Sequence, residues 1–232
     1  MPKWTIQLRG DAGDLENLAD QFRSSACAVA REQDAFNLTS TKLNELEDPH
    51  EALAEAKNII AMLRSSFYLR LGLFPKIEVA GVVKVEDGGK RTSHIFPSPI
   101  TLRRHIGTPT IVVSGAPPSP PDVSRESAVE IAMRDPKVAK ALRIFGSREH
   151  NWHNLNNIFE VVQSDAGGQI TKAGWATRAE IDRFTQTANS AGAIGDDARH
   201  GSEKVPVPKN PMSLADADAL ITRIVTEWIE SK

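Results

Sequence analysis

The sequence predicts an α+β protein in which a ferredoxin-like (split βαβ) sheet with an added hairpin is followed by a helical bundle. Three observations support this prediction. Residues 1–115 mix alternating and helical apolar periods, residues 124–232 carry only helical periods, and four prolines fall within 117–121. Proline removes backbone donors and disfavours helix, so this run predicts an extended linker. We therefore expect domains at 1–115 and 124–232, joined by a Pro-rich linker at 116–123.

The first domain is expected to open with a strand, a helix, a hairpin and a second helix. Apolar residues alternate over 4–8, which is a strand period, and Asp11 precedes a helical apolar face. Two short alternating runs flank Gln33-Asp34 and predict a hairpin. Asp48-Pro49 combines an N-cap with an N1 proline, and the helix that follows carries an apolar stripe from Leu53 to Leu71.

A second hairpin and a last short strand are expected to complete this domain. Residues 76–96 alternate around Asp87-Gly88-Gly89, where glycine supplies a positive φ, and residues 110–114 form an apolar run. The order strand, helix, hairpin, helix, strand is the split βαβ arrangement, and the extra strands would extend its sheet. Because this fold hosts many functions, the fold alone does not indicate one.

The second domain is expected to be entirely helical. Its apolar residues recur at spacings of three and four, which is typical of core-facing helices rather than of a partner groove. The expected caps are Ser124 or Asp122, Asp135, Thr177 with Glu180, and Ser213 with Asp216.

Composition excludes several classes of function. The chain has 232 residues and a net charge of -2, so no general basic excess attracts it to nucleic acid or anionic membrane. Cys27 is the single cysteine, which excludes an intramolecular disulfide and a cysteine-based zinc site. No apolar run approaches the roughly 20 residues that span a bilayer. We expect a soluble, cytoplasmic protein without a cofactor or metal, since P-loop and dinucleotide fingerprints are also missing.

The densest group of polar residues lies at 147–160. On one continuous helix His150, His153, Asn154 and Asn157 would share a face that could bind metal, phosphate or an acidic partner. Two histidines at this spacing offer two imidazole ligands, whereas zinc usually takes a third protein ligand. The alternative is a solvated helix face, because Asn and His are ordinary surface residues.

Arg148 and His153 resemble the Arg-x(4–6)-His signature of HEPN ribonucleases, which are small helical proteins that often act as dimers. The resemblance implies that Arg148 would steady a phosphate and His153 would transfer a proton. Glu149 departs from the family pattern, because a polar residue such as Asn, Asp or His commonly follows the arginine. Positions five apart on a helix also differ by about 140° and do not converge.

Arg199, His200 and Gly201 form a second candidate site. Arginine offers a planar fork for carboxylate or phosphate, and histidine titrates near neutral pH. The alternative is structural, since Asp196 and Asp197 are adjacent and could pair with Arg199. In that case the arginine would tether the loop at 189–211.

Several segments of the second half together resemble a pattern shared by many bacterial proteins that have no assigned activity. These segments are WHNLNNIFEVV, GW, IDRFTQTAN, ARHG and PMSLADADALITRIVTEWI. The N-terminal WTIQLRGDAGDLENLADQF and the segment ALAEAKNIIAMLR also fit. The resemblance includes Arg199 and His200 but not His153, and it implies no particular chemistry.

Basic residues also gather near the second hairpin, at Lys90, Arg91, Arg103 and Arg104. They could form a nucleic-acid surface, or they could protect an edge strand from aggregation. Because no complete catalytic group is present, the leading hypothesis is a bacterial binding or regulatory module whose partner is another protein or a second copy. The alternatives are a HEPN-like, metal-independent ribonuclease of a phage-defence or toxin system, and a phosphate or acidic-ligand protein using Arg199-His200.

Overall fold

The computed structural model of the chain describes residues 3–24, 26–86, 88–94, 96, 128–147, 150–198 and 205–232. Several predicted features lie outside these residues. They are the linker at 116–123, the strand at 110–114, and Arg103, Arg104, Arg148, Arg199 and His200. The predictions that depend on them therefore stay predictions.

The first half is built on a five-stranded antiparallel sheet, which confirms the α+β class. The strands are β1 (Lys3–Gly10), β2 (Cys27–Glu32), β3 (Ala35–Ser40), β4 (Ile77–Val85) and β5 (Arg91–His94). Their order is β2-β3-β1-β4-β5, and each neighbouring pair is antiparallel. Both predicted hairpins are present, and Gly88 and Gly89 take the positive φ expected at the second turn.

Helices of the first half are α1, α2 and α3, and those of the second half are α4 to α9. Their bounds are α1 (Ala12–Gln21), α2 (Thr41–Asn44), α3 (Pro49–Leu71), α4 (Ala128–Arg134), α5 (Pro136–Ser147), α6 (Trp152–Asp165), α7 (Arg178–Asn189), α8 (Ala191–Ile194) and α9 (Leu214–Glu230), with a 3₁₀ turn η1 (Gly195–Asp197). None of these helices is both long and apolar enough to cross a membrane.

Four of these helices begin at the N-cap residue that the sequence predicts. Asp11 and Asp48 each accept two backbone N–H groups at the starts of α1 and α3. Thr177 and Glu180 form a reciprocal capping box at α7, and Ser213 accepts a backbone N–H at α9. These caps satisfy N–H groups that have no partner within the helix, so they fix where each helix begins.

The core of the first half lies between the sheet and its helices. Trp4, Ile6 and Leu8 alternate into this core from β1, as the strand period predicts. Residues of α3 are buried on more than one side, because the helix packs on β4 and on α5. The predicted apolar stripe of α3 ends early, however. Leu71 is 41% exposed, since the helix stops at Gly72 beyond the elements that cover it.

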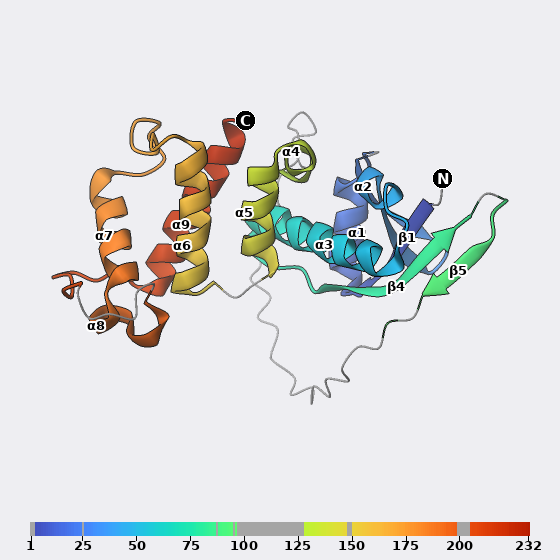
Figure 1. The fold of residues 1–232 in the computed structure, drawn as a ribbon, viewed down its shortest axis with the longest axis horizontal. Helices are drawn as coiled ribbons and strands as arrows, with labels where there is room; N and C mark the ends of the chain where they lie inside the picture. Colours follow the sequence, from blue (N-terminus) through green and yellow to red (C-terminus); the bar gives the residue numbers. More distant parts are fainter. Residues whose placement is uncertain are drawn as a thin grey trace.

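Close contact between α3 and α5 joins the two halves. Gly146 has no room for a side chain, because a Cβ there would overlap the carbonyl oxygen of Ala61 and lie 2.6 Å from Ser65 Oγ. The Ser65 hydroxyl donates to the Leu142 carbonyl at 2.6 Å. Figure 1 shows α5 between α3 and the later helices, and α6 packs against both α5 and α9. Buried apolar residues of both halves consequently form one continuous core.

Candidate functional site

A cleft of about 290 Å³ opens beside α3, where that helix meets the paired ends of β1 and β4 and the C-terminal end of α5. We call it the α3 cleft. The residues that line it are Arg9, Lys57, Ile60, Ala61, Arg64, Ile77, Glu78, Val79 and Gly146. It therefore combines three cationic side chains, one carboxylate and an apolar floor.

One face of α3 supplies the main wall of this cleft. Lys57, Ile60, Ala61 and Arg64 stand at i, i+3, i+4 and i+7, so a straight helix presents them together. Ile60 and Ala61 are buried and form the floor. With a rise of 1.5 Å per residue, the two cations are separated by about 10 Å along the helix axis. The helix thus places a positive charge at each end of an apolar strip.

Positive charge is only partly balanced in the cleft. Arg9 pairs with Glu78 at 2.9 Å, and both side chains are largely exposed. No acidic side chain among the described residues forms an ion pair with Lys57 or Arg64. The lining therefore carries two cations in excess of its acids, which favours an anionic ligand.

Arg64 is the most unusual residue of the lining. Its side chain is half-buried, and its buried Nε has no hydrogen-bond acceptor in the described part of the chain. Its guanidinium carbon lies 5.6 Å from the centroid of the Phe74 ring. A buried donor without an acceptor costs about 1–3 kcal/mol and is rare in folded proteins. Arg64 is thus held by an aromatic ring rather than by an acid.

Phe74 belongs to an aromatic cluster around His150. The His150 ring lies 5.1 Å from Phe74, 5.5 Å from Tyr68 and 4.4 Å from Phe145, measured between ring centroids. All three contacts are edge-to-face, and Phe74 also stacks on Tyr68 at 4.4 Å. Phe74 therefore contacts both Arg64 at the cleft and His150 behind it.

Both ring nitrogens of His150 face acceptors. Nδ1 lies 2.6 Å from Oδ1 of Asp218, and Nε2 lies 3.0 Å from the carbonyl oxygen of Phe145. The other carboxylate oxygen of Asp218 accepts a hydrogen bond from the Tyr68 hydroxyl at 3.1 Å. A neutral imidazole has one N–H, so only the imidazolium can donate to both partners. The fold therefore selects the charged form of His150.

The pKa values of this group agree with that geometry. Burial lowers the pKa of His150, but the hydrogen bonds to Asp218 and the Phe145 carbonyl outweigh it and leave the pKa above its usual range. Burial raises the pKa of the Asp218 carboxyl, and its bonds to His150 and Tyr68 more than reverse this effect. Burial and the Asp218 charge raise the pKa of Tyr68. All three groups thus keep the charge state that their contacts require.

The polar face predicted at 147–160 does not form. His150 precedes α6, because Asn151 accepts the backbone N–H of Asn154 and starts the helix at Trp152. Asn154 is buried, whereas His153 is exposed. The structure therefore separates His150 from His153 and Asn154 and brings it to Tyr68 and Asp218 instead.

Asn157 lines a separate groove of about 390 Å³ between α5 and α6. Lys137, Lys140 and Glu160 are also part of its lining. Lys137 forms an ion pair with Asp165 at 3.4 Å. This groove is lined by two cations and one acid, and one of the cations, Lys137, is already paired, so its excess of positive charge is smaller than that of the α3 cleft.

The remaining predicted sites are described only in part. Lys90 pairs with Glu86 at 3.8 Å, and Arg91 lies on the edge strand β5. The ribonuclease hypothesis depends on Arg148 and the second ligand hypothesis on Arg199-His200, all outside the described residues. Both stay predictions. Among the residues that the structure does describe, no three His, Cys, Asp or Glu side chains are grouped to hold a metal ion.

Sequence reasoning missed Arg64 and Asp218. A signal for Arg64 was present, since a charged residue stands between the apolar positions Leu63 and Phe67 of the α3 stripe. No local signal indicates Asp218, because its partners are 68 and 150 positions away. Comparison with protein-family models, with curated proteins and with solved structures finds no match to this chain. Its function is therefore inferred from the geometry of the site.

Proposed function

We propose that this protein is a binding module without catalytic activity of its own, and that it takes a small anionic ligand in the α3 cleft. One observation carries the proposal. Arg64 lines a concave, positively charged surface, and no acid among the described residues forms an ion pair with its guanidinium. An anion in the cleft would supply the counter-charge that the described residues do not.

The chemistry of the lining supports an anion with a small apolar part. Arginine presents its donors as a planar fork that suits carboxylate or phosphate, and Lys57 adds a point charge. Ile60 and Ala61 provide apolar area between the two cations. Ligand sites commonly combine such an apolar surface with a few polar groups that fix orientation.

The same lining supports binding rather than catalysis. Among the described residues, its lining contains no serine, cysteine or histidine that could act as nucleophile or proton carrier. Its one carboxylate, Glu78, is held by Arg9 at 2.9 Å. A ligand in this cleft would therefore meet cationic donors, apolar surface and one carboxylate that is already paired.

Titration calorimetry with sulfate and with inorganic phosphate tests the proposal. We expect Arg64→Gln to weaken binding at least about tenfold, since a charge-assisted hydrogen bond contributes about 1.5–3 kcal/mol. Arg70→Gln is the matched control, because Arg70 lies on the same helix and donates to Gln21 outside the cleft. Equal losses in the two variants, or no binding by the unchanged protein, would overturn the proposal.

We further propose that the first half is a ferredoxin-like split βαβ sheet and that the second half is a helical bundle. The strand order supports the first part, since β3 lies between β2 and β1 and β1 lies between β3 and β4. The packing of α6 against α5, α7 and α9 supports the second. A cytoplasmic location and a protein partner or second copy are also proposed. Light scattering on the purified protein tests self-association.

A further inference from the structure

We infer that protonation of His150 controls how tightly the α3 cleft binds its anion, through Phe74 and the C-terminal end of α5. This inference rests on the proposed function and adds its regulation. Phe74, whose ring lies against Arg64 at the cleft, also packs against His150.

The first connection runs through the Phe74 ring. The Phe74 ring centroid lies 5.6 Å from the Arg64 guanidinium carbon and 5.1 Å from the His150 ring centroid, with an angle of 84° between the two rings. A charged imidazolium is attracted to an aromatic ring, and a neutral imidazole is attracted less. Protonated His150 therefore holds Phe74 more firmly, and Phe74 in turn orients the guanidinium of Arg64.

The second connection runs through the backbone of α5. The carbonyl of Phe145 accepts from His150 Nε2 at 3.0 Å, and the next residue, Gly146, lines the cleft. When His150 loses a proton, its remaining N–H stays with the Asp218 carboxylate, which is the stronger acceptor. Nε2 then presents a lone pair to the Phe145 carbonyl, and this contact is lost. The wall of the cleft formed by Gly146 loses that support.

Among the described residues, the ionisable groups that contact His150 come from two surrounding helices. Asp218 comes from α9 and Tyr68 from α3, while α5 contributes the Phe145 carbonyl. Arg64 of α3 lies beyond the Phe74 ring. Asp218 and the carbonyl both favour the imidazolium, so protonation assembles the group and deprotonation loosens it. Both connections therefore predict tighter anion binding when His150 is charged.

Linkage requires the reverse effect as well. If protonation of His150 strengthens anion binding by some factor, a bound anion strengthens proton binding at His150 by the same factor. The pKa of His150 should consequently rise when the cleft is occupied. A role of His150 confined to holding the fold together would not produce this shift.

Sulfate affinity measured at about pH 5.5 and about pH 8.5 tests the inference, because histidine titrates between these values and sulfate keeps its charge. We expect the unchanged protein to bind at least about fivefold more weakly at the higher pH, within the usual range of coupling between sites. His150→Gln should bind equally at both, since glutamine does not titrate. His153→Gln is the control, because His153 is exposed on α6, and it should keep the full pH dependence.

Two further measurements keep the inference open to refutation if His150→Gln does not fold. Phe74→Leu removes the ring between Arg64 and His150 and should reduce the pH dependence of sulfate binding. NMR titration of His150 in the unchanged protein should give a higher pKa with saturating sulfate than without it. An unchanged pKa, or equal pH dependence in the unchanged protein and His150→Gln, would overturn the inference while Arg64-dependent binding stands. No sulfate binding at either pH would overturn both proposals.

Discussion

Tyr68 on α3 donates a hydrogen bond of 3.1 Å to Asp218 on α9, and so connects the helix that covers the sheet with the last helix of the chain. The other oxygen of the same carboxylate lies 2.6 Å from His150 Nδ1. Figure 1 shows α3 and α9 belonging to opposite halves of the molecule. One carboxylate therefore ties together α3, α9 and the segment that precedes α6.

The His150–Asp218 pair should make stability depend on pH. The pKa of His150 is raised above 6.5. Its contribution to the free energy of unfolding is therefore complete below about pH 6.5 and is lost as pH rises through the folded-state pKa. The pKa of Asp218 is lowered below 3.8, so its contribution is lost only as pH falls through that lower value. Urea unfolding across pH should show a decline on the alkaline side.

Asp218→Asn isolates that effect. The amide can still accept from Tyr68, but it removes the charge that favours the imidazolium. We expect a loss of about 1.5–3 kcal/mol near neutral pH, as for hydrogen bonds to charged groups, and a flatter alkaline decline. The same alkaline slope in Asp218→Asn and the unchanged protein would show that the pair is not its source.

Gly146→Ala tests the close contact between α3 and α5. In an unobstructed helix this change would be stabilising by about 1 kcal/mol, because alanine is the better helix former. Here the new Cβ would overlap the Ala61 backbone carbonyl, which cannot move aside as a flexible side chain could. We expect a net loss of about 1–3 kcal/mol in urea unfolding. Gly13→Ala in α1 is the control, since its Cβ would meet only Asp11 Oδ1, at 3.3 Å.

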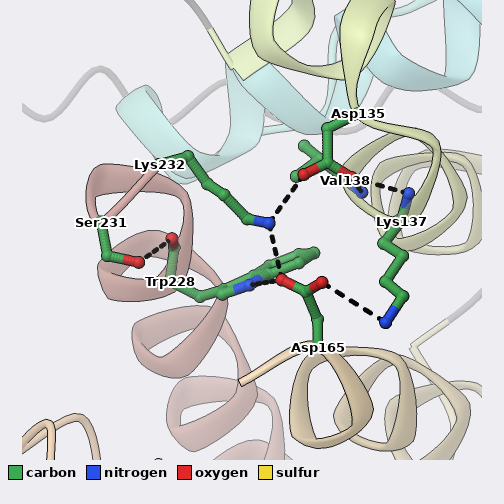
Figure 2. Close-up of polar contacts among 7 residues, drawn as sticks. All are labelled: Asp135, Lys137, Val138, Asp165, Trp228, Ser231 and Lys232. Atoms are coloured by element: carbon green, nitrogen blue, oxygen red, sulfur yellow. Dashed lines mark hydrogen bonds and ion pairs between the residues drawn. The ribbon is translucent and has the colours of Figure 1, made fainter. Parts of the chain in front are cut away.

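Charged groups at the C-terminal end of α9 form a second set of ion pairs between helices. Figure 2 shows Lys232 between Asp135, which precedes α5, and Asp165, which ends α6. The Lys232 ammonium lies 2.7 Å and 2.6 Å from the two carboxylates. Asp165 also accepts from the Trp228 indole at 2.9 Å and pairs with Lys137 at 3.4 Å.

Asp165→Asn should remove the ion pairs with Lys232 and Lys137 while leaving the Trp228 indole an acceptor. Burial raises the pKa of Asp165, but its bonds to Lys232 and Trp228 outweigh burial and lower it. The stabilisation is thus present above the usual carboxyl pKa and disappears as pH falls through the lowered one. We expect a loss of about 1 kcal/mol at neutral pH, given solvent screening. Asp182→Asn, in an exposed pair with Arg178, should cost about 0.5 kcal/mol or less.

Cys27 should report on unfolding of the sheet. The thiol is 1% exposed, and burial raises its pKa to about 12. Since the thiolate is the reactive form, a disulfide reagent should not modify the folded protein near neutral pH and should modify it fully in urea. Rapid modification without denaturant would mean that β2, an edge strand, opens readily.

Features specified by neighbouring residues could be predicted from the sequence. The cap at Asp48, the capping box at Thr177 and Glu180, and both hairpin turns each depend on residues a few positions apart. The shared polar face expected at 147–160 does not form because two local preferences compete. A helical period runs through 147–160, but the Asn151 side chain satisfies the first free N–H groups and leaves His150 outside the helix.

The candidate site could not be predicted in the same way. Arg64 and Phe74 are near in sequence, yet the cleft also requires Arg9 and Glu78 from paired strands and Gly146 from α5. The His150 group joins residues of α3, α5 and α9 with residues of the segments that follow α3 and precede α6. Periodicity shows that each helix has a buried face but not which helices bury one another. The packing of α3 against α5 therefore positions both the α3 cleft and the His150 group.

The most direct test of the central claim is the Arg64 Nε–H resonance, observed by NMR during a sulfate titration and assigned by its absence in Arg64→Gln. An anion in the α3 cleft should move this resonance saturably, because it would bind the guanidinium that carries this N–H. The Arg70 resonance should stay in place. A resonance of Arg64 that does not move, or that moves linearly together with that of Arg70, would contradict an anion site in the α3 cleft.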